Sequence, residues 1–149
     1  MPANRDQGRG DGVEIRPATP ADLDAMAAIQ VASPEAARWK VTDYLDHQCL
    51  VASVAGSVVG FLAFRTVAPD EREVLNLAVS PDFRRRGAGR RLFAASLEGF
   101  QGLVFLEVRE SNTAARLFYK SMSFMEVMRR QNYYQDPLEA AIVMKFHSC

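Results

Sequence analysis

The clearest hydrophobic pattern in this chain lies in its middle, where apolar residues form strand-like runs. β-Branched and aromatic residues fill the segments Cys49 to Val54 and Ser57 to Thr66, with only Ala55-Gly56 between them. That pattern predicts two strands joined by a tight hairpin turn. After a polar loop, a third strand is expected from Glu73 to Val79.

Helix signals precede these strands. Thr19-Pro20-Ala21-Asp22 combines a capping hydroxyl, proline at the first helical position and an acid in the first turn, so a helix is expected to about Ala32. Ser33-Pro34-Glu35 repeats this signal, and Thr42-Asp43 is a candidate cap for a further short turn. Linked helices in this region would suit a lid over a substrate.

The rest of the pattern indicates the fold class. A first strand is expected at Val13 to Arg16, and the second half of the chain alternates helix and strand before two closing strands. The expected segments are a helix at about Ala88 to Gly99, a strand at Leu103 to Val108, a helix at about Thr113 to Ser121, and strands near Phe124 to Asn132 and Ala140 to Phe146. This order predicts an α+β (α/β-like) fold, a mixed and mostly antiparallel sheet with one parallel strand-helix-strand crossover at its centre.

Length and composition fit one globular domain. The chain has 149 residues, and a single domain from residue 13 to 149 is expected behind a polar leader, Met1 to Gly12, that should be disordered. Cys49 and Cys149 lie far apart and no secretory or membrane-spanning segment is present, which favours a reduced cytoplasmic compartment. Two cysteines and two histidines without ligand spacing offer no metal site, and no membrane partner is expected.

A loop rich in arginine and glycine joins the predicted strand Leu75 to Val79 to the next helix. The segment Arg84 to Gly89 has the features of a diphosphate cradle, because its glycines let backbone approach a ligand and the following helix aims unpaired N–H groups at an anion. Its arginines add charge and forked donors. It matches neither the Walker pattern nor the three-glycine dinucleotide-binding pattern.

The alternative interpretation of this loop is a solvated basic face or a nucleic-acid patch. Five arginines in the eight residues from Arg84 to Arg91 would attract any phosphate. Lysine plus arginine, however, number 18, the same as aspartate plus glutamate. Because nucleic-acid binders usually carry a basic excess over the whole domain, a local anion pocket fits better, and no nucleic-acid partner is expected.

Glu107 interrupts the otherwise apolar run from Leu103 to Val108, which is typical of a strand covered on both faces. A carboxylate in such surroundings is costly in its ionised form and becomes a stronger base, so Glu107 is a candidate general base. The alternative is that Glu107 ends the strand and pairs with a neighbouring arginine such as Arg109.

Tyr119 belongs to the helix that follows, for which Ser111 or Asn112 is a candidate N-cap. The apolar stripe of this helix is formed by Ala115, Phe118 and Met122. Tyr119 lies beside that stripe, from where it could reach a cleft next to the strand. The commoner fate of a tyrosine is to pack its ring and leave the hydroxyl in water.

Two motifs, one after the other along the chain, resemble those of the GNAT superfamily of N-acetyltransferases. Arg84-Arg85-Arg86-Gly87-Ala88-Gly89 is similar to its acyl-coenzyme A loop, Gln/Arg-x-x-Gly-x-Gly/Ala. The segments running from Leu106 through Tyr119 to Phe124, then Arg129-Arg130-x-Asn132-Tyr133-Tyr134 and Ala141 to Met144, resemble the ribosomal-protein-alanine N-acetyltransferase branch. With Asn76 to Pro81, the resemblance covers about Val51 to Phe146.

The resemblance implies a GNAT-type fold whose central parallel strands splay into a V-shaped opening for acetyl-CoA, the cosubstrate. It implies that Glu107 is the general base and Tyr119 the acid that protonates the leaving thiolate. An N–H at Val79 would stabilise the developing oxyanion. Residues implied to bind acetyl-CoA are Leu77, Ala78, Val79, Arg84, Arg85, Arg86, Gly87, Ala88, Gly89, Arg90 and Asn112, and those implied near the acceptor are Trp39, Tyr133 and Tyr134.

The function implied by the resemblance is transfer of an acetyl group from acetyl-CoA to a primary amine by direct attack. A peptide or protein N-terminal α-amine is the implied acceptor, and a monomer or weak homodimer is expected. A small-molecule amine or a lysine side chain remains an alternative acceptor. A catalytically silent module that binds acyl-CoA or nucleic acid is the alternative from another class.

The chain departs from the family pattern in three places. Ser123 stands where the family usually has glycine, so the turn there adopts a different backbone or tolerates strain. The connection from Leu92 to Gly102 is about one helical turn shorter than is common. The segment from Ser33 to Gln48, which bears on acceptor specificity, has no close match.

Overall fold

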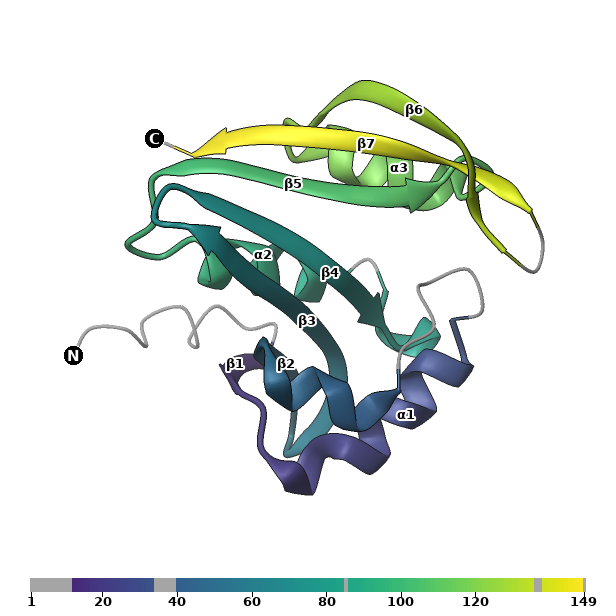
Figure 1. The fold of residues 1–149 in the computed structure, drawn as a ribbon. Coiled ribbons are helices and arrows are strands. Elements are labelled where there is room, and N and C mark those ends of the chain that lie inside the picture. The colour runs from purple at the N-terminus through teal and green to yellow at the C-terminus, as the bar shows by residue number, and fades with distance from the viewer. Residues whose placement is uncertain (1–11, 34–39, 85, 136–137, 149) are drawn as a thin grey trace. The chain divides into compact units, whose positions relative to one another are not determined.

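The computed structural model describes residues 12–33, 40–84, 86–135 and 138–148 (Figure 1). Most of the predicted leader lies outside the described residues, as do Pro34 and Glu35 of the second predicted helix start. The chain divides into two compact units. The first comprises Met1–Phe64 and Asn76–Glu98, and the second comprises Arg65–Leu75 and Gly99–Cys149.

Seven strands within the described residues form one mixed sheet in the order β1-β2-β3-β4-β5-β7-β6. The strands are β1 Val13–Pro17, β2 Gln48–Val54, β3 Ser57–Ala68, β4 Glu71–Val79, β5 Gly102–Arg109, β6 Met125–Tyr134 and β7 Glu139–Ser148. The helices are α1 Leu23–Val31, α2 Ala88–Ser96 and α3 Thr113–Ser121, with short 3-10 turns at Pro20–Asp22, Val41–Asp46 and Pro81–Phe83. The predicted mixed, mostly antiparallel sheet with one parallel pair is confirmed, because β4 and β5 run parallel.

Several predicted boundaries differ from the structure, among them the following. The helix expected to reach Gly99 ends at Ser96, and Gly99 has a φ of 72°, which no helical residue adopts. The strand expected from Glu73 begins at Glu71, because Glu71 to Glu73 pair with the start of β5. The helix expected from Pro20 opens with a 3-10 turn before α1 begins.

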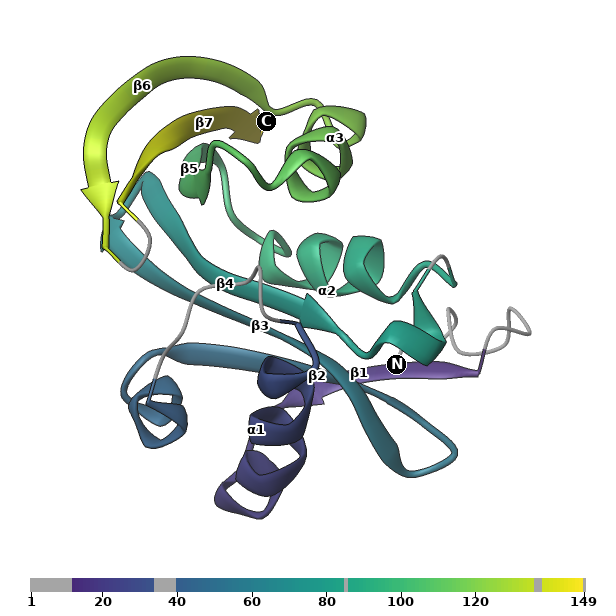
Figure 2. The same ribbon diagram turned by 90° about the vertical axis from the view of Figure 1, so that its right-hand side faces the viewer.

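The first unit is built on the predicted hairpin of β2 and β3. Val54 pairs with Ser57, which leaves Ala55 and Gly56 as the two-residue turn, and both have positive φ as that turn type requires. Residues 59–64 of β3 are all buried, so both faces of the strand are covered. Figure 2 shows the reason, because α1 and α2 lie on opposite faces of this part of the sheet.

At the start of the first helical segment, the predicted capping hydroxyl and the predicted acid together form a capping box. Thr19 and Asp22 satisfy each other's backbone N–H groups, and the Thr19 amide donates to the Asp22 carboxylate over 2.8 Å. Arg16 of β1 adds two hydrogen bonds of 2.8 Å to both oxygens of that buried carboxylate. These contacts fasten the beginning of the helix to the edge of the sheet.

Acid should therefore weaken the first unit through Asp22. Arg16 and the Thr19 amide lower the pKa of this carboxyl from 3.8 to about 2. Because the folded-state pKa lies below the unfolded one, the stabilisation is complete above about pH 4 and is lost as the pH falls toward 2. Asp22→Asn should lower the free energy of unfolding by about 2 kcal/mol at neutral pH. Urea unfolding at pH 6, 4 and 3 tests this, since the difference between variant and wild type should shrink with acid.

The second unit contains the parallel pair of β4 and β5 and the antiparallel strands β7 and β6. The register between β4 and β5 runs from Glu71 opposite Leu103 to Glu73 opposite Phe105, and β5 pairs along its whole length with residues 141–148 of β7. The helix α3 is tied to β6 by Arg116, which donates to both oxygens of Glu126. Along the part of the chain that the structure describes, no helix is both long and apolar enough to cross a membrane.

Candidate active site

The predicted diphosphate loop lies in the first unit, between β4 and α2. Gly87 is the N-cap of α2 and has a φ of 85°, a conformation that L-residues with a side chain adopt only under strain. The first helical hydrogen bond runs from the Arg91 amide to the Gly87 carbonyl over 3.0 Å. The amides of Ala88 and Gly89 therefore precede the first intrahelical donor, as expected at an anion-binding helix start.

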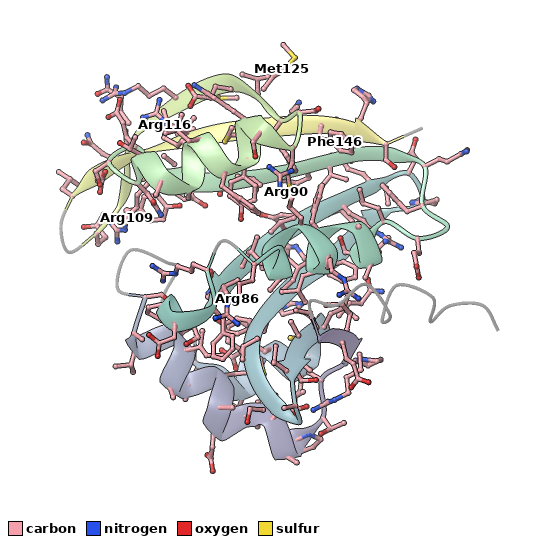
Figure 3. The ribbon with its side chains drawn as sticks, turned by 180° about the vertical axis from the view of Figure 1, so that it is seen from behind. Arg86, Arg90, Arg109, Arg116, Met125 and Phe146 are labelled. Atoms are coloured by element: carbon pink, nitrogen blue, oxygen red, sulfur yellow. The ribbon has the colours of Figure 1, made fainter. Side chains whose placement is uncertain are left out.

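The described arginines of this loop differ in their surroundings. Arg84 donates from Nε to the Val79 carbonyl over 3.0 Å and from Nη2 to the buried Ser33 hydroxyl over 2.9 Å. Its guanidinium thus ties the loop to the end of β4 and to the residue after α1. Arg86 stacks over the Phe83 ring at 5.1 Å, and Arg90 lies exposed in the first turn of α2 (Figure 3).

The end of β4 carries the three other predicted cofactor residues of this unit. Ala78 is buried, whereas Leu77 and Val79 are half-buried. Gly60 of β3 lies against them, because a Cβ atom there would stand 3.1 Å from the Ala78 carbonyl oxygen. Sequence reasoning missed Gly60, although an isolated glycine within an apolar strand is the usual signal of such a close backbone approach.

A buried polar network fastens the α1 side of the first unit to β4. Asn76 of β4 donates from Nδ2 to the Tyr44 hydroxyl over 2.8 Å, and that hydroxyl donates to the side chain of Gln30 in α1. Tyr44 is fully buried, and burial raises its pKa to about 12. The helix α1 and the 3-10 turn at Val41–Asp46 are thus fastened to β4 by three side chains that were not singled out from the sequence.

Glu107 lies on β5 in the second unit, with both carboxylate oxygens occupied. Arg130 of β6 donates from Nη1 to Oε2 over 2.5 Å, and the Tyr133 hydroxyl donates to Oε1 over 2.6 Å. The predicted alternative, pairing with an arginine such as Arg109, is confirmed for the residue type, but the partner is Arg130, whereas Arg109 pairs with Glu139 at 3.3 Å. Glu107 does form an ion pair with an arginine, but the partner comes from the outermost strand.

The strand β7 makes that contact possible. It lies between β5 and β6, where Glu107 is opposite Val143 and Arg130 is opposite Ala141. Alanine is short enough for the side chain of Arg130 to pass over the strand and reach Glu107. Two residues predicted for different roles, Glu107 and Tyr133, are therefore brought into direct contact.

Tyr134, the other tyrosine predicted near the acceptor, packs against Tyr133. Tyr134 meets Tyr133 edge to face at 5.1 Å and lies under the Arg109 guanidinium at 4.4 Å. Burial raises the pKa of Tyr134 to about 12, and the hydrogen bond to Glu107 raises that of Tyr133. Both phenols are consequently protonated at neutral pH, and that of Tyr133 donates to Glu107.

Tyr119 is buried on α3, between Phe118 at 5.5 Å and Phe124 at 5.4 Å. Its hydroxyl forms no hydrogen bond to any residue that the structure describes. Burial raises the pKa of Tyr119, so the phenol keeps its proton. The packed ring agrees with the commoner alternative for a tyrosine, and the role of Tyr119 as the acid stays a prediction.

Asn112 is the N-cap of α3, which settles the choice left open between it and Ser111. Its Oδ1 accepts a hydrogen bond of 3.1 Å from the Ala115 amide. The Ser111 amide instead donates to Glu139. The cap fixes where α3 begins, and the role of Asn112 toward a cofactor stays a prediction.

The turn after α3 holds Tyr119 in place. Ser123 has a φ of 77°, the Ser123 amide donates to the Lys120 carbonyl, and the Phe124 amide donates to the Tyr119 carbonyl, both over 3.0 Å. This is the Schellman end of a helix, which normally uses glycine at the left-handed position. The chain thus adopts the left-handed backbone at this turn and accepts the strain of serine there.

Ser123→Gly should therefore stabilise the fold. Glycine removes the left-handed strain and costs some chain entropy, so a net gain of about 0.5 to 1 kcal/mol is expected. In a chain of this size that gain raises Tm by roughly 1 to 4 °C. Ser121→Gly, at an ordinary helical position of α3, is the matched control and should lower Tm in the same thermal scan.

Two predicted site residues, Trp39 and Arg85, lie outside the described residues. The predicted V-shaped opening draws on both units, so it stays a prediction. Among the residues that the structure covers, no group of three or more His, Cys, Asp and Glu side chains could hold a metal ion. The candidate catalytic and binding groups are therefore the Glu107 carboxylate, the phenols of Tyr119, Tyr133 and Tyr134, and the glycine-arginine loop before α2.

Comparison with known proteins identifies the family. The model of the acetyltransferase (GNAT) family matches residues 21–124. This chain belongs to that family. It is 39% identical over 95 residues to a ribosomal protein bS18-alanine N-acetyltransferase of Escherichia coli (strain K12), a match that covers 60% of this chain and 64% of that protein. The match therefore spans less than two thirds of the length of that curated relative.

Solved structures agree with this membership of the GNAT family. Ard1 from Thermoplasma volcanium is 31% identical with a TM-score of 0.84, covering 93% of this chain and 99% of that chain. The ribosomal-protein-S18-alanine N-acetyltransferase from Escherichia coli is 30% identical with a TM-score of 0.74, covering 92% and 95%. The predicted GNAT-type fold is thereby confirmed.

Proposed function

We propose that this protein is an acetyl-CoA-dependent N-acetyltransferase whose acceptor is a protein N-terminal α-amine. The observation that carries the proposal is Glu107 on β5 of a GNAT-family chain, a mostly buried carboxylate contacted by Arg130 and Tyr133 of β6. A carboxylate in that position can accept the proton that the acceptor ammonium must lose. The E. coli relative is named for acetylating an alanine of ribosomal protein bS18, which supports this acceptor class.

The first unit supplies residues suited to acetyl-CoA. The amides of Gly87, Ala88 and Gly89, together with Arg86 and Arg90, would bind the diphosphate at the start of α2. Arg84 would act through the loop backbone, since its guanidinium already binds the Val79 carbonyl and Ser33. Leu77, Ala78 and Val79 would contact the pantetheine arm. Asn112, from the second unit, would contact the far arm of the cofactor.

The proposed reaction is direct attack without a covalent enzyme intermediate. Glu107 takes a proton from the acceptor ammonium, and the nitrogen lone pair then attacks the thioester carbonyl. The Val79 N–H stabilises the oxyanion that forms, an effect typically worth a few kcal/mol. Collapse expels the coenzyme A thiolate, the Tyr119 phenol gives a proton to that sulfur, and the second proton that the acceptor nitrogen loses restores the phenol through solvent.

We further infer that the protein acts in the cytoplasm as a monomer or weak homodimer, on peptide acceptors and without a nucleic-acid or membrane partner. Equal numbers of basic and acidic residues support this, because no excess charge attracts a polyanion.

Competition between acceptors tests the proposed function. An Ala-starting peptide, the same peptide with a blocked N-terminus and an internal lysine, and a polyamine are each supplied with acetyl-CoA. We expect the Ala-starting peptide to show the highest kcat/KM, because an α-ammonium loses its proton about two pKa units more easily than a lysine. Preference for either other acceptor would move the assignment to lysine or small-amine acetylation. Absence of coenzyme A release with all three would contradict the enzyme assignment.

A further inference from the structure

We propose that Arg130 occupies the cation position on Glu107 that the acceptor ammonium takes during turnover, so that Arg130 is a specificity-determining residue. The inference rests on the proposed function, which makes Glu107 the group that meets the acceptor. An acceptor then enters by displacing the Arg130 guanidinium. A cationic acceptor can do this at low cost, and a neutral one cannot.

Both oxygens of the Glu107 carboxylate already accept hydrogen bonds. Oε1 of Glu107 accepts from the Tyr133 hydroxyl over 2.6 Å and Oε2 accepts from Arg130 over 2.5 Å. An ammonium that comes to Glu107 must therefore replace one of these donors. The Glu107 side chain is 15% exposed and that of Arg130 is 49% exposed, so the carboxylate is recessed and the guanidinium reaches it from the outside.

Arg130 is the donor better placed to leave. It stands on β6, the outermost strand of the sheet, and the register between β6 and β7 becomes irregular directly after it. Asn132, two residues on, has a φ of 54°. The guanidinium also lies 4.5 Å from the Tyr133 ring, and this cation–π contact can persist when the ion pair with Glu107 is broken.

Charge then selects the acceptor. Removing a guanidinium from a recessed carboxylate leaves a charge that has lost its partner, which is unfavourable. An incoming ammonium replaces that partner with another cation, whereas a neutral ligand does not. Tyr133 remains on Oε1 throughout and keeps the carboxylate oriented.

Variants of Arg130 and its neighbour test the proposal. Arg130→Met keeps the unbranched stem of the side chain without its charge or donors, and Arg130→Lys keeps the charge. Arg129→Met is the matched control, because Arg129 is the next residue of β6 and forms the corresponding pair with Glu110 at 2.8 Å. We expect Arg130→Met to lower KM for an Ala-starting peptide about two- to fivefold, the factor expected for releasing a partly exposed ion pair. Arg130→Lys and Arg129→Met should keep KM near the wild-type value.

A binding measurement separates this proposal from the proposed function. Calorimetric titration of the Ala-starting peptide into each variant measures the displacement without turnover, and the N-acetylated peptide is the neutral control. Tighter binding to Arg130→Met alone, with weak binding of the acetylated peptide to wild type, supports the proposal even if acetyl transfer is absent. Unchanged or weaker binding to Arg130→Met, or a lower kcat at unchanged KM, would show that Arg130 positions Glu107 instead and overturns the proposal.

Discussion

Glu107→Gln is expected to lower kcat/KM for acetyl transfer by at least about 100-fold, the lower range for loss of a general base. Glutamine keeps the size of the side chain and can still accept the hydrogen bond from Tyr133, and it loses the charge and the acceptor for Arg130. The loss therefore reports proton transfer rather than shape. The measurement is coenzyme A release with the Ala-starting peptide across pH, and the low-pH limb of the rate profile should flatten.

Glu110→Gln is the matched control for this experiment. Glu110 follows the end of β5 and pairs with Arg129 of β6, as Glu107 pairs with Arg130. We expect it to change kcat/KM by less than about threefold, since it removes only an exposed ion pair. Activity of Glu107→Gln within that same range, in a folded protein, would mean that water or another carboxylate such as Glu73 accepts the proton.

The part of the fold that could be predicted from the sequence depends on local signals. The hairpin turn at Ala55-Gly56 and the bounds of α3, Thr113 to Ser121, agree with the structure, because turn chemistry and capping act between near neighbours in the chain. The arginine-glycine loop at the start of α2 was also placed correctly, because its motif is a short run of neighbouring residues. The position of Glu107 on a strand was also predictable from its apolar neighbours, but the expected cover on both faces is wrong, because burial alternates along β5 and Glu107 lies on its less buried face.

The contacts of the site depend on the order of strands, which no local pattern contains. Arg130 reaches Glu107 only because β7, the last strand in the chain, lies between β5 and β6. The same limit applies to Arg84, whose partner Ser33 is 51 residues earlier, and to the contact of Asn76 with Tyr44. Each residue type was visible in the sequence, but its partner was set by tertiary packing.

Acetyl-CoA should stabilise the protein against heat, and replacement of Gly87 should remove the effect. At about one hundred times its dissociation constant, a ligand that binds only the folded state adds roughly 2.7 kcal/mol, which raises Tm by about 5 to 11 °C in a chain of this size. Valine at Gly87 would keep the backbone from its φ of 85° and place a β-branched side chain where the diphosphate is proposed to bind.

Gly56→Val separates loss of the site from loss of stability. Gly56 lies in the hairpin turn with a φ of 86°, and a Cβ atom at either glycine would meet no atom within 4 Å. Both variants therefore bear a similar backbone strain, about 1 to 3 kcal/mol, but only one changes the loop before α2. We expect Gly56→Val to melt earlier and still gain the full acetyl-CoA shift, while Gly87→Val melts earlier and gains none. A full shift in Gly87→Val would place the diphosphate away from this loop, and no shift in wild type at low salt would remove acetyl-CoA as the cosubstrate.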